Sequence, residues 1–416
     1  MLRQANRAAV LRHVILARET TRSRVGDACG LSVGSVTNVV NDLLDEGLIE
    51  ETGSMPSGAG RPTTLLSPRA EGAYFVGVDV GEQGVAVELF DLRMNRVDRE
   101  FARADSDSLP EPAAIAAALT AAVTRVWSRH PDLQEGIAGI GLGLPGVVEA
   151  EPGGDVLYAQ TLGWPRVEVA DLLDVSGLGD VAVYAANGAK TLAAAENAFG
   201  AARGAERAVV ALLGRGVGLG VLQDGHLLAG RAGTAAEWGH TRVALRGRRC
   251  ACGGSGCLEA YVGAEGILGR WREAGGEPDG HGWNALGALV EAAAGGDDAA
   301  GRVLDETVEI LGLGLGSVVN LYNPERLVIG GWVGLRLMES RAAAIEVACR
   351  DSALPHFASQ LSVQPCAFGG DSVALGSALL PLEHLIDPPT ARTFRPDDGR
   401  HQHVLVPTAA PSKEMS

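Results

Sequence analysis

Three cysteines and one histidine lie close together in the second half of the sequence, and their types and spacing favour metal binding. Cys250, Cys252 and Cys257 belong to the segment CACGGSGC, and His240 precedes it by a short spacer. One imidazole and three thiolates form a set that closes a tetrahedral zinc site and leaves no position for water. The glycines between the cysteines let the chain fold tightly round an ion. We therefore predict structural Zn²⁺ here; the alternative is three reduced cysteines in a flexible loop.

The composition is that of a globular protein of the cell interior. The chain has 416 residues, of which 46% are hydrophobic and 21% charged, enough for a sizeable core in two or three domains. The other cysteines, Cys29, Cys349 and Cys366, are scattered, which fits a metal site better than a disulfide framework. No segment resembles a signal peptide, and no apolar run approaches the roughly 18 residues of a membrane span. We expect a cytoplasmic protein with no membrane partner.

Charge is distributed unevenly along the chain. The net charge of −16 argues against a nucleic-acid partner, because DNA contact relies on Lys and Arg side chains that neutralise phosphates. The N-terminal segment differs: before Gly26 its only acid is Glu19, and it contains Arg3, Arg7, Arg12, Arg18, Arg22 and Arg24. The acidity therefore lies downstream of a basic beginning.

Apolar periodicity predicts three short helices at the N-terminus. The spacing of hydrophobic residues indicates one helix within 5–17 and a second over 22–29. A turn at 30–32 separates them from a third helix that Gly47 can end. Its apolar stripe follows the i, i+3, i+4, i+7, i+8 pattern and consists of Val36, Val39, Val40, Leu43 and Leu44.

The other face of the third helix carries short polar residues. Ser35, Thr37 and Asn38 would not obstruct a close approach to a major groove. Two strands at 48–50 and 63–66 then predict a hairpin. The pattern indicates a winged helix-turn-helix over residues 1–68. The alternative is a small helical interaction module with a polar surface.

Two basic residues complete the predicted DNA-binding surface. Arg61 lies near the tip of the hairpin, where it would reach a phosphate or a minor groove. Arg24, in the second helix, is assigned to phosphate contacts.

Downstream of Tyr74 the sequence alternates buried strands with glycine-rich turns. Such turns follow strands in the segments 74–84, 208–225 and 327–331, and they let backbone N–H groups approach a phosphate closely. Each turn alone is also compatible with an ordinary β-turn. Two α/β lobes over residues 69–387 explain their order better. The tail 388–416 has almost no periodicity and is predicted to be disordered.

Several of these segments together resemble the ROK family, which contains bacterial sugar kinases and sugar-responsive repressors. The landmarks are GLPG at 143–146, EWGH at 237–240, the cysteine segment with the following Leu-Glu, NPERLVIGG at 323–331 and ALGSA at 374–378. The resemblance implies an actin/hexokinase-like two-lobed α/β fold, preceded in the repressors by a winged helix-turn-helix.

The resemblance also implies a sugar pocket. Glu237, His240 and Glu259 would face the sugar, and Asn187 and Gly146 would complete the site. A metal-bound histidine is fixed in tautomer and orientation, so zinc would hold a sugar-binding residue in place. The alternative for the two glutamates is a solvated surface or a supporting position beside the metal.

This sequence lacks the catalytic base that the resemblance implies for the kinases of the family. The resemblance implies Asn-Asp-Ala-Asn where this chain has Asn187-Gly188-Ala189-Lys190, and glycine cannot act as the general base for a sugar hydroxyl. The turn after Asp79 lacks the Thr and Lys of the kinases, and Arg215 stands where they usually have Thr. We therefore predict a non-enzymatic, sugar-responsive regulator, most naturally a repressor of carbohydrate-metabolism genes. The alternatives are an ATP-dependent sugar kinase with a DNA-binding head and a pure protein-interaction module.

Two-fold symmetry completes the prediction. A homodimer, or a homotetramer built as a dimer of dimers, would place paired heads on a palindromic operator, and a sugar would alter their spacing. Lys190 would favour an anionic effector if it faces the pocket. A solvated position on the helix surface is the more ordinary alternative.

Overall fold

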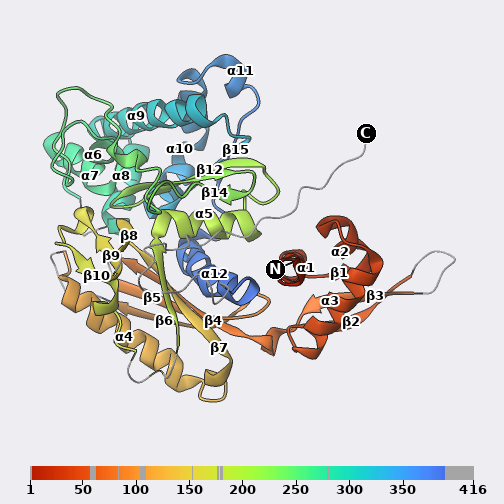
Figure 1. The fold of residues 1–416 in the computed structure, drawn as a ribbon. Helices are drawn as coiled ribbons and strands as arrows, with labels where there is room; N and C mark the ends of the chain where they lie inside the picture. Colours follow the sequence, from red (N-terminus) through yellow and green to blue (C-terminus); the bar gives the residue numbers. More distant parts are fainter. Residues whose placement is uncertain are drawn as a thin grey trace.

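The structure, a computed structural model, describes residues 2–56, 62–82, 84–103, 109–151, 153–175, 178, 181–278 and 282–388. The predictions for Arg61 and for the tail after Pro388 lie outside these residues. Figure 1 shows a small N-terminal unit, in red, beside a larger two-lobed part. We call residues 2–68 the head and residues 69–388 the body.

The head is a winged helix-turn-helix. Three helices precede an antiparallel hairpin, and a short strand after the first helix gives a sheet in the order β1-β3-β2. The elements are α1 (Leu2–Ala17), β1 (Thr20–Thr21), α2 (Arg22–Cys29), α3 (Val33–Asp45), β2 (Ile49–Met55) and β3 (Thr63–Pro68). The three helices and the hairpin predicted from periodicity are therefore confirmed.

Side-chain caps explain why the helices of the head begin where they do. The Thr21 hydroxyl accepts a hydrogen bond from the Arg24 backbone N–H at the start of α2, and Ser32 accepts one from Ser35 at the start of α3. Gly30 ends α2 in the left-handed region, with φ of 66°. The predicted apolar stripe of α3 is buried against α1, except that Leu44 is half-buried.

The first lobe of the body is a five-stranded sheet in the order β11-β7-β4-β5-β6. Its strands are β4 (Tyr74–Gly81), β5 (Gly84–Asp91), β6 (Arg96–Arg103), β7 (Ile137–Leu144) and β11 (Val183–Asn187). Strands β4, β7 and β11 run parallel, and their carboxyl ends therefore meet at one edge. Helix α4 (Pro112–Arg129) packs on one face of this sheet. A small sheet of β8 (Val147–Glu151), β9 (Gly154–Tyr158) and β10 (Val167–Glu168) extends the lobe.

The second lobe contains another five-stranded sheet, in the order β14-β13-β12-β15-β16. Its strands are β12 (Arg207–Leu213), β13 (Val217–Gln223), β14 (His226–Leu227), β15 (Arg326–Gly330) and β16 (Ser362–Pro365). The helices of this lobe are α6 (Glu259–Val262), α7 (Ala264–Glu273), α8 (Gly282–Ala294), α9 (Asp298–Tyr322), α10 (Gly331–Asp351) and α11 (Pro355–Ala358). Across the described ranges, no helix is both long and apolar enough to cross a membrane.

Two helices pack together in the middle of the molecule, between the sheets and beside the head. Helix α5 (Gly188–Phe199) contacts β12 and β13, and α12 (Ser372–Ile386) lies on β4 and β7 (Figure 1). The backbone of α12 approaches the sheet so closely that a Cβ on Gly141 would lie 1.9 Å from the Ser377 carbonyl oxygen. Glycine is therefore required there. The expected two-lobed α/β fold is confirmed.

Candidate functional site

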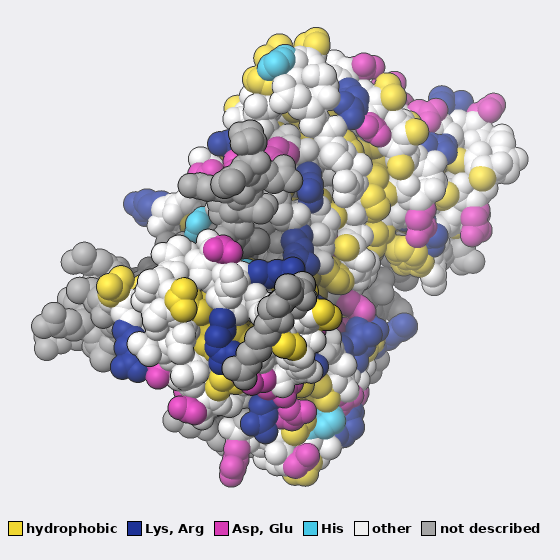
Figure 2. Space-filling view, turned by 90° about the vertical axis from the view of Figure 1, so that its right-hand side faces the viewer, with side chains coloured by type: hydrophobic (Ala, Val, Ile, Leu, Met, Phe, Trp, Pro, Cys, Tyr) yellow, Lys and Arg dark blue, Asp and Glu magenta, His cyan; other side chains and the backbone are white. Residues whose placement is uncertain are grey.

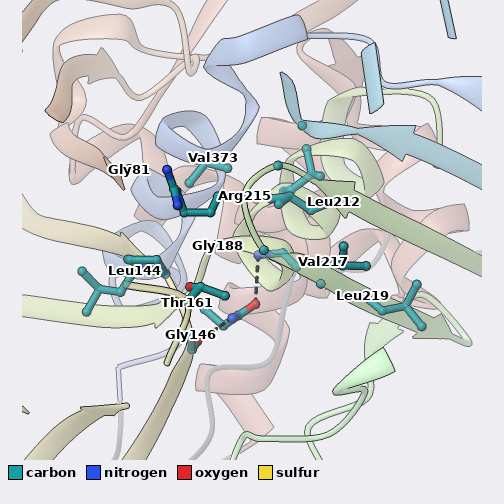
Figure 3. Close-up of a pocket in the computed structure, with 18 of the residues that line it drawn as sticks. Gly81, Leu144, Gly146, Thr161, Gly188, Leu212, Arg215, Val217, Leu219 and Val373 are labelled. Atoms are coloured by element: carbon teal, nitrogen blue, oxygen red, sulfur yellow. Dashed lines mark hydrogen bonds between the residues drawn. The ribbon is translucent and has the colours of Figure 1, made fainter. Parts of the chain in front are cut away.

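A pocket lies between the two lobes. The carboxyl ends of β4, β7 and β11 and the first turns of α5, α10 and α12 surround it. Figure 3 shows Leu144 and Gly146 of the first lobe on one side and Leu212, Val217 and Leu219 of the second lobe on the other. The predicted sugar-binding residues all line this single pocket: Gly146, Asn187, Glu237, His240 and Glu259. Crevices beyond the carboxyl ends of parallel strands are the usual ligand sites of such sheets. The chain thus brings together residues that are far apart in the sequence.

The four predicted metal ligands converge at one side of the pocket. One ligand atom from each of His240, Cys250, Cys252 and Cys257 lies within 4.8 Å of every other. The sulfurs of Cys252 and Cys257 are 3.8 Å apart, and Cys250 Sγ is 3.7 Å from His240 Nδ1. A tetrahedral Zn²⁺ with Zn–S distances of about 2.3 Å would hold two sulfurs about 3.8 Å apart. The cluster therefore has the size and donor set of a structural zinc site.

The orientation of His240 connects this cluster to the pocket. Its Nδ1 faces the cysteines, so Nε2 is the ring nitrogen left for other contacts. His240 also lines the pocket. The same imidazole can therefore bind a metal through Nδ1 and contact a pocket ligand through Nε2.

Two glutamates stand beside His240, and they differ in exposure: Glu259 is buried, whereas Glu237 is exposed. Glu259, 7% exposed, accepts a hydrogen bond from the Val217 backbone N–H and lies 3.5 Å from Cys250 Sγ. Burial raises the pKa of Glu259, and the nearby His240 opposes the rise. Glu237 is exposed on one side, but the surrounding pocket partly desolvates its carboxyl group and raises its pKa, against the influence of His240 and Lys190. Both carboxyl groups are available to accept hydrogen bonds from hydroxyl groups in the pocket.

Asn187 shapes the pocket wall. Its Oδ1 accepts a hydrogen bond from Ala189 N at 2.9 Å and so caps α5, while its Nδ2 donates to the Gly146 carbonyl. Gly146 has φ of 100°, and a Cβ there would lie 2.3 Å from the Tyr158 carbonyl oxygen. The amide thus retains one N–H and one lone pair for a ligand.

Gly188, in the first turn of α5, stands where the family resemblance implies the catalytic aspartate of the kinases. A Cβ on Gly188 would meet nothing closer than Leu144 O at 3.7 Å and a Val373 methyl at 3.8 Å, so packing does not force a glycine there. The interpretation of Lys190 as a solvated lysine is wrong. Its Nζ is buried and has no hydrogen-bond partner in the described part of the chain. Burial lowers the pKa of Lys190 and Glu237 opposes this, which places the ammonium near that carboxylate rather than in water.

Asp79 and Trp332 are among the pocket residues that were missed as site residues. Asp79, at the end of β4, has its pKa raised to about 7 by burial and by the charges of Glu82, Glu88 and Asp371. Trp332 follows the turn after β15, and a Cβ on Gly214 would lie 3.3 Å from its Nε1. The glycine-rich turns in 74–84 and 327–331 marked the neighbourhood of both residues, but hydrophobic strand patterns do not show which side chains line a pocket between distant segments.

Four of the five predicted DNA-binding residues fall within the described residues, and they lie at the surface of the head. Arg24, Thr37 and Asn38 are exposed and Ser35 is half-buried. Basic and acidic side chains are interspersed over the face that carries the head, rather than gathered in one field (Figure 2). DNA contact by this surface would therefore depend on a few local residues.

Comparison with known proteins places the chain in a family. The sequence model of the protein family described as "ROK family" matches residues 75–384. The chain belongs to the ROK family. A curated ROK-type relative, the "Xylose repressor" of Caldicellulosiruptor bescii, is 28% identical over 338 residues, which cover 79% of this chain and 84% of the relative.

Two solved structures show how far the ROK fold extends along the chain. One, described as a ROK family transcriptional regulator and homologue of the E. coli MLC protein, is 24% identical and covers 93% of this chain and 97% of its own, with a TM-score of 0.74. The other is a ROK glucokinase from Streptomyces griseus in complex with glucose and AMPPNP. It is 26% identical and covers 74% of this chain and 99% of its own, with a TM-score of 0.62. The body alone thus resembles a kinase, and the whole chain has the fold of a regulator.

Proposed function

We propose that this chain is a sugar-responsive, DNA-binding transcriptional regulator, most plainly a repressor of carbohydrate-metabolism genes. The head binds operator DNA through Arg24, Ser35, Thr37, Asn38 and Arg61. The pocket binds a sugar or sugar derivative through Gly146, Asn187, Glu237, His240 and Glu259. The family membership, the relative named a repressor and the glycine at position 188 support regulation over phosphate transfer.

One observation carries this proposal: two helices each have one end in the pocket and the other against the head. At the pocket end, α5 contributes Asn187 and Gly188, and α12 contributes Ser372 and Val373. Both helices run away from the pocket toward the head and pack against each other along the way. A displacement of their first turns in the pocket would therefore also displace their last turns, which contact the head.

At the head end, each helix makes specific contacts. The guanidinium of Arg18 lies 5.5 Å from the centre of the Phe199 ring, at the end of α5. Arg203, just after α5, donates to the Leu16 carbonyl at 2.8 Å. Arg7 of α1 donates to the Ile386 carbonyl at the end of α12. The head is thus fixed to the ends of the two helices rather than joined to them only by the chain.

Zinc belongs to the proposal as a structural ion. His240, Cys250, Cys252 and Cys257 would hold it, and when bound it would contribute free energy of folding and no chemistry on the sugar. Binding of the sugar would be carried out by residues of the chain. The cluster fixes the His240 ring, and the Val217 backbone N–H donates a hydrogen bond to Glu259 Oε2 at 3.1 Å. Both side chains are thereby oriented for a ligand before it arrives.

The response follows from linkage. A sugar changes operator affinity only if it binds one arrangement of the lobes better than the other. Closure of the lobes would move the starts of α5 and α12, and their far ends would reorient the heads. A cytoplasmic homodimer or homotetramer would convert that reorientation into a change of half-site spacing on a palindromic operator.

A thermal-shift screen of neutral sugars, amino sugars and sugar phosphates tests the pocket. A ligand that binds only the native state raises the unfolding temperature, and we expect Glu259→Gln to reduce the shift given by any hit. Each hit is then incubated with ATP and the parent protein. Sugar-dependent ATP consumption by the parent would overturn the proposal in favour of the kinase. Gly188→Asp, at a position where packing leaves room for a Cβ, measures how far the missing base limits turnover.

A further inference from the structure

We propose that α3 recognises thymine methyl groups through Val33 and the methyl group of Thr37. This inference rests on the proposed DNA-binding function and specifies what the head reads. It changes the expected chemistry of the surface, because the sequence suggested hydrogen bonding by short polar residues and the structure presents two apolar groups instead.

Val33 is an exposed hydrophobic side chain at the first position of α3. Its exposed fraction is 85%, while the buried stripe of the same helix packs against the rest of the head. Its neighbours Ser32 and Gly34 are small and exposed, and a Cβ on Gly34 would meet nothing within 4 Å. The residues at the start of a recognition helix are those that contact base edges. Val33 is therefore placed to enter a major groove without obstruction.

The hydroxyl group of Thr37 is already engaged within the helix. Its Oγ1 donates to the Val33 carbonyl at 2.8 Å, as threonine does when it bonds the preceding turn. The methyl group is the other substituent on Cβ, so it forms the outward part of this exposed side chain. Ser35 is similarly committed, because its Oγ lies 3.0 Å from Ser32 Oγ. Two of the three short polar residues thus already use their hydroxyls in hydrogen bonds within the head, and each hydroxyl keeps a lone pair as an acceptor.

Asn38 supplies the polar part of the surface. Its side chain is exposed at the surface of the head. An asparagine amide pairs in a bidentate manner with adenine in the major groove. The thymine methyl is displayed in the major groove only, and threonine methyl groups and other apolar side chains recognise it. The half-site therefore combines thymine methyls with an adenine.

The spacing on the helix restricts the spacing on the DNA. Val33 and Thr37 are four residues apart and lie on the same face, with Cβ atoms about 5–6 Å apart. Successive bases of one strand rise by about 3.4 Å. The two contacted thymines are therefore one or two base pairs apart in each half-site.

Acidic residues do not oppose this arrangement. The acids of α3 lie at its far end, where Asp42 pairs with Arg3 at 2.7 Å and Glu46, just beyond the helix, pairs with Arg7. The amino end of α3, with the positive end of its helix dipole, faces outward. The electrostatic profile of the helix thus favours its Val33 end as the end nearest the phosphates.

The test begins with full-length protein and a random duplex library, from which bound duplexes are selected. Each thymine of the selected duplex is then replaced by deoxyuridine, which removes one methyl group and keeps the base pair. We expect a weakening of about three- to fivefold at one or two thymines per half-site, the effect of exposing one buried methyl group. Substitutions at other thymines should leave the affinity unchanged.

Protein variants identify the partner of each methyl group. Thr37→Ser removes only the methyl and keeps the hydroxyl bonded to the backbone, so it should abolish the deoxyuridine effect at one thymine and leave the other. Val33→Ser should abolish the effect at the second thymine, and Val33→Thr should restore part of it. Val97→Ser, at an exposed valine on β6 of the body, is the matched control and should behave as the parent.

The outcomes separate this inference from the function on which it rests. If no duplex is selected, the DNA-binding proposal fails. If duplexes are selected but deoxyuridine has no effect at any position, or its effects are the same in Thr37→Ser and Val33→Ser as in the parent, methyl recognition is wrong while DNA binding stands.

Discussion

Arg12 and Glu383 form an ion pair that joins the head to the body across most of the sequence. Arg12 Nη2 lies 2.6 Å from Glu383 Oε2, and the two side chains are 21% and 6% exposed. Arg12 is on α1, and Glu383 is in the last turns of α12. The pair lies beside the apolar contact between α1 and α12. Helix α12 therefore begins at the pocket and, near its other end, pairs through Glu383 with Arg12 of the head.

Removing Arg12 should loosen the head. Arg12→Ala leaves the Glu383 carboxylate buried without its partner, a change that costs about 3 kcal/mol in comparable pairs. Hydrogen exchange should show the loss as reduced protection of the α1 and α12 amides. Arg12→Ala combined with Glu383→Gln should recover part of the protection, because no charge then stays buried alone. Unchanged exchange in Arg12→Ala would mean that the pair does not hold the head.

Asp79 should make stability depend on pH. Burial raises its pKa to about 7, so the folded protein keeps a proton that the unfolded chain releases between about pH 4 and 7. Folding stability should therefore fall as the pH rises through that window. Urea unfolding at several pH values should show a smaller fall in Asp79→Asn. The remainder is due to other carboxyl groups with raised pKa values, among them Glu88, whose pKa burial raises to about 7, and Glu259. An unaltered pH dependence in Asp79→Asn would contradict this assignment, and Glu135→Gln, at an exposed site, is the control.

These features separate what the sequence could predict from what it could not. The helices of the head follow from apolar spacing and local caps, and the metal cluster follows from a short segment rich in cysteine and glycine. The Arg12–Glu383 pair and the burial of Lys190 arise from segments far apart in the chain, which local patterns do not record. The exposure of Val33 was not anticipated either, because its side chain is apolar and only the packed head shows which face remains open.

Removing zinc should destabilise the body, because a structural site contributes free energy of folding. Cys250→Ser should lower the bound zinc below about half an equivalent per chain and lower the unfolding temperature. Cys29→Ser, at a half-buried thiol of the head, should keep the metal. Metal analysis of the purified proteins checks both. A folded, sugar-responsive parent protein with little zinc would refute the structural role.

Arg24 and Asn38 should affect DNA binding in different ways. Arg24→Ala should weaken binding about equally on all duplexes and flatten its salt dependence, because a phosphate contact carries no sequence information. Asn38→Ala should cost about 1–3 kcal/mol on the selected duplex and relax its sequence preference. Mobility shifts on specific and random duplexes measure both effects. Variants that all match the parent would remove α2 and α3 from the DNA-binding surface.

The central claim is that pocket and head are coupled, and the most direct measurement is the affinity of the full-length protein for its selected operator with and without the stabilising sugar. We predict a change of at least about fivefold, which corresponds to about 1 kcal/mol of coupling, and its disappearance in Glu259→Gln. A sugar that binds the parent protein tightly and leaves operator affinity unchanged would contradict the account.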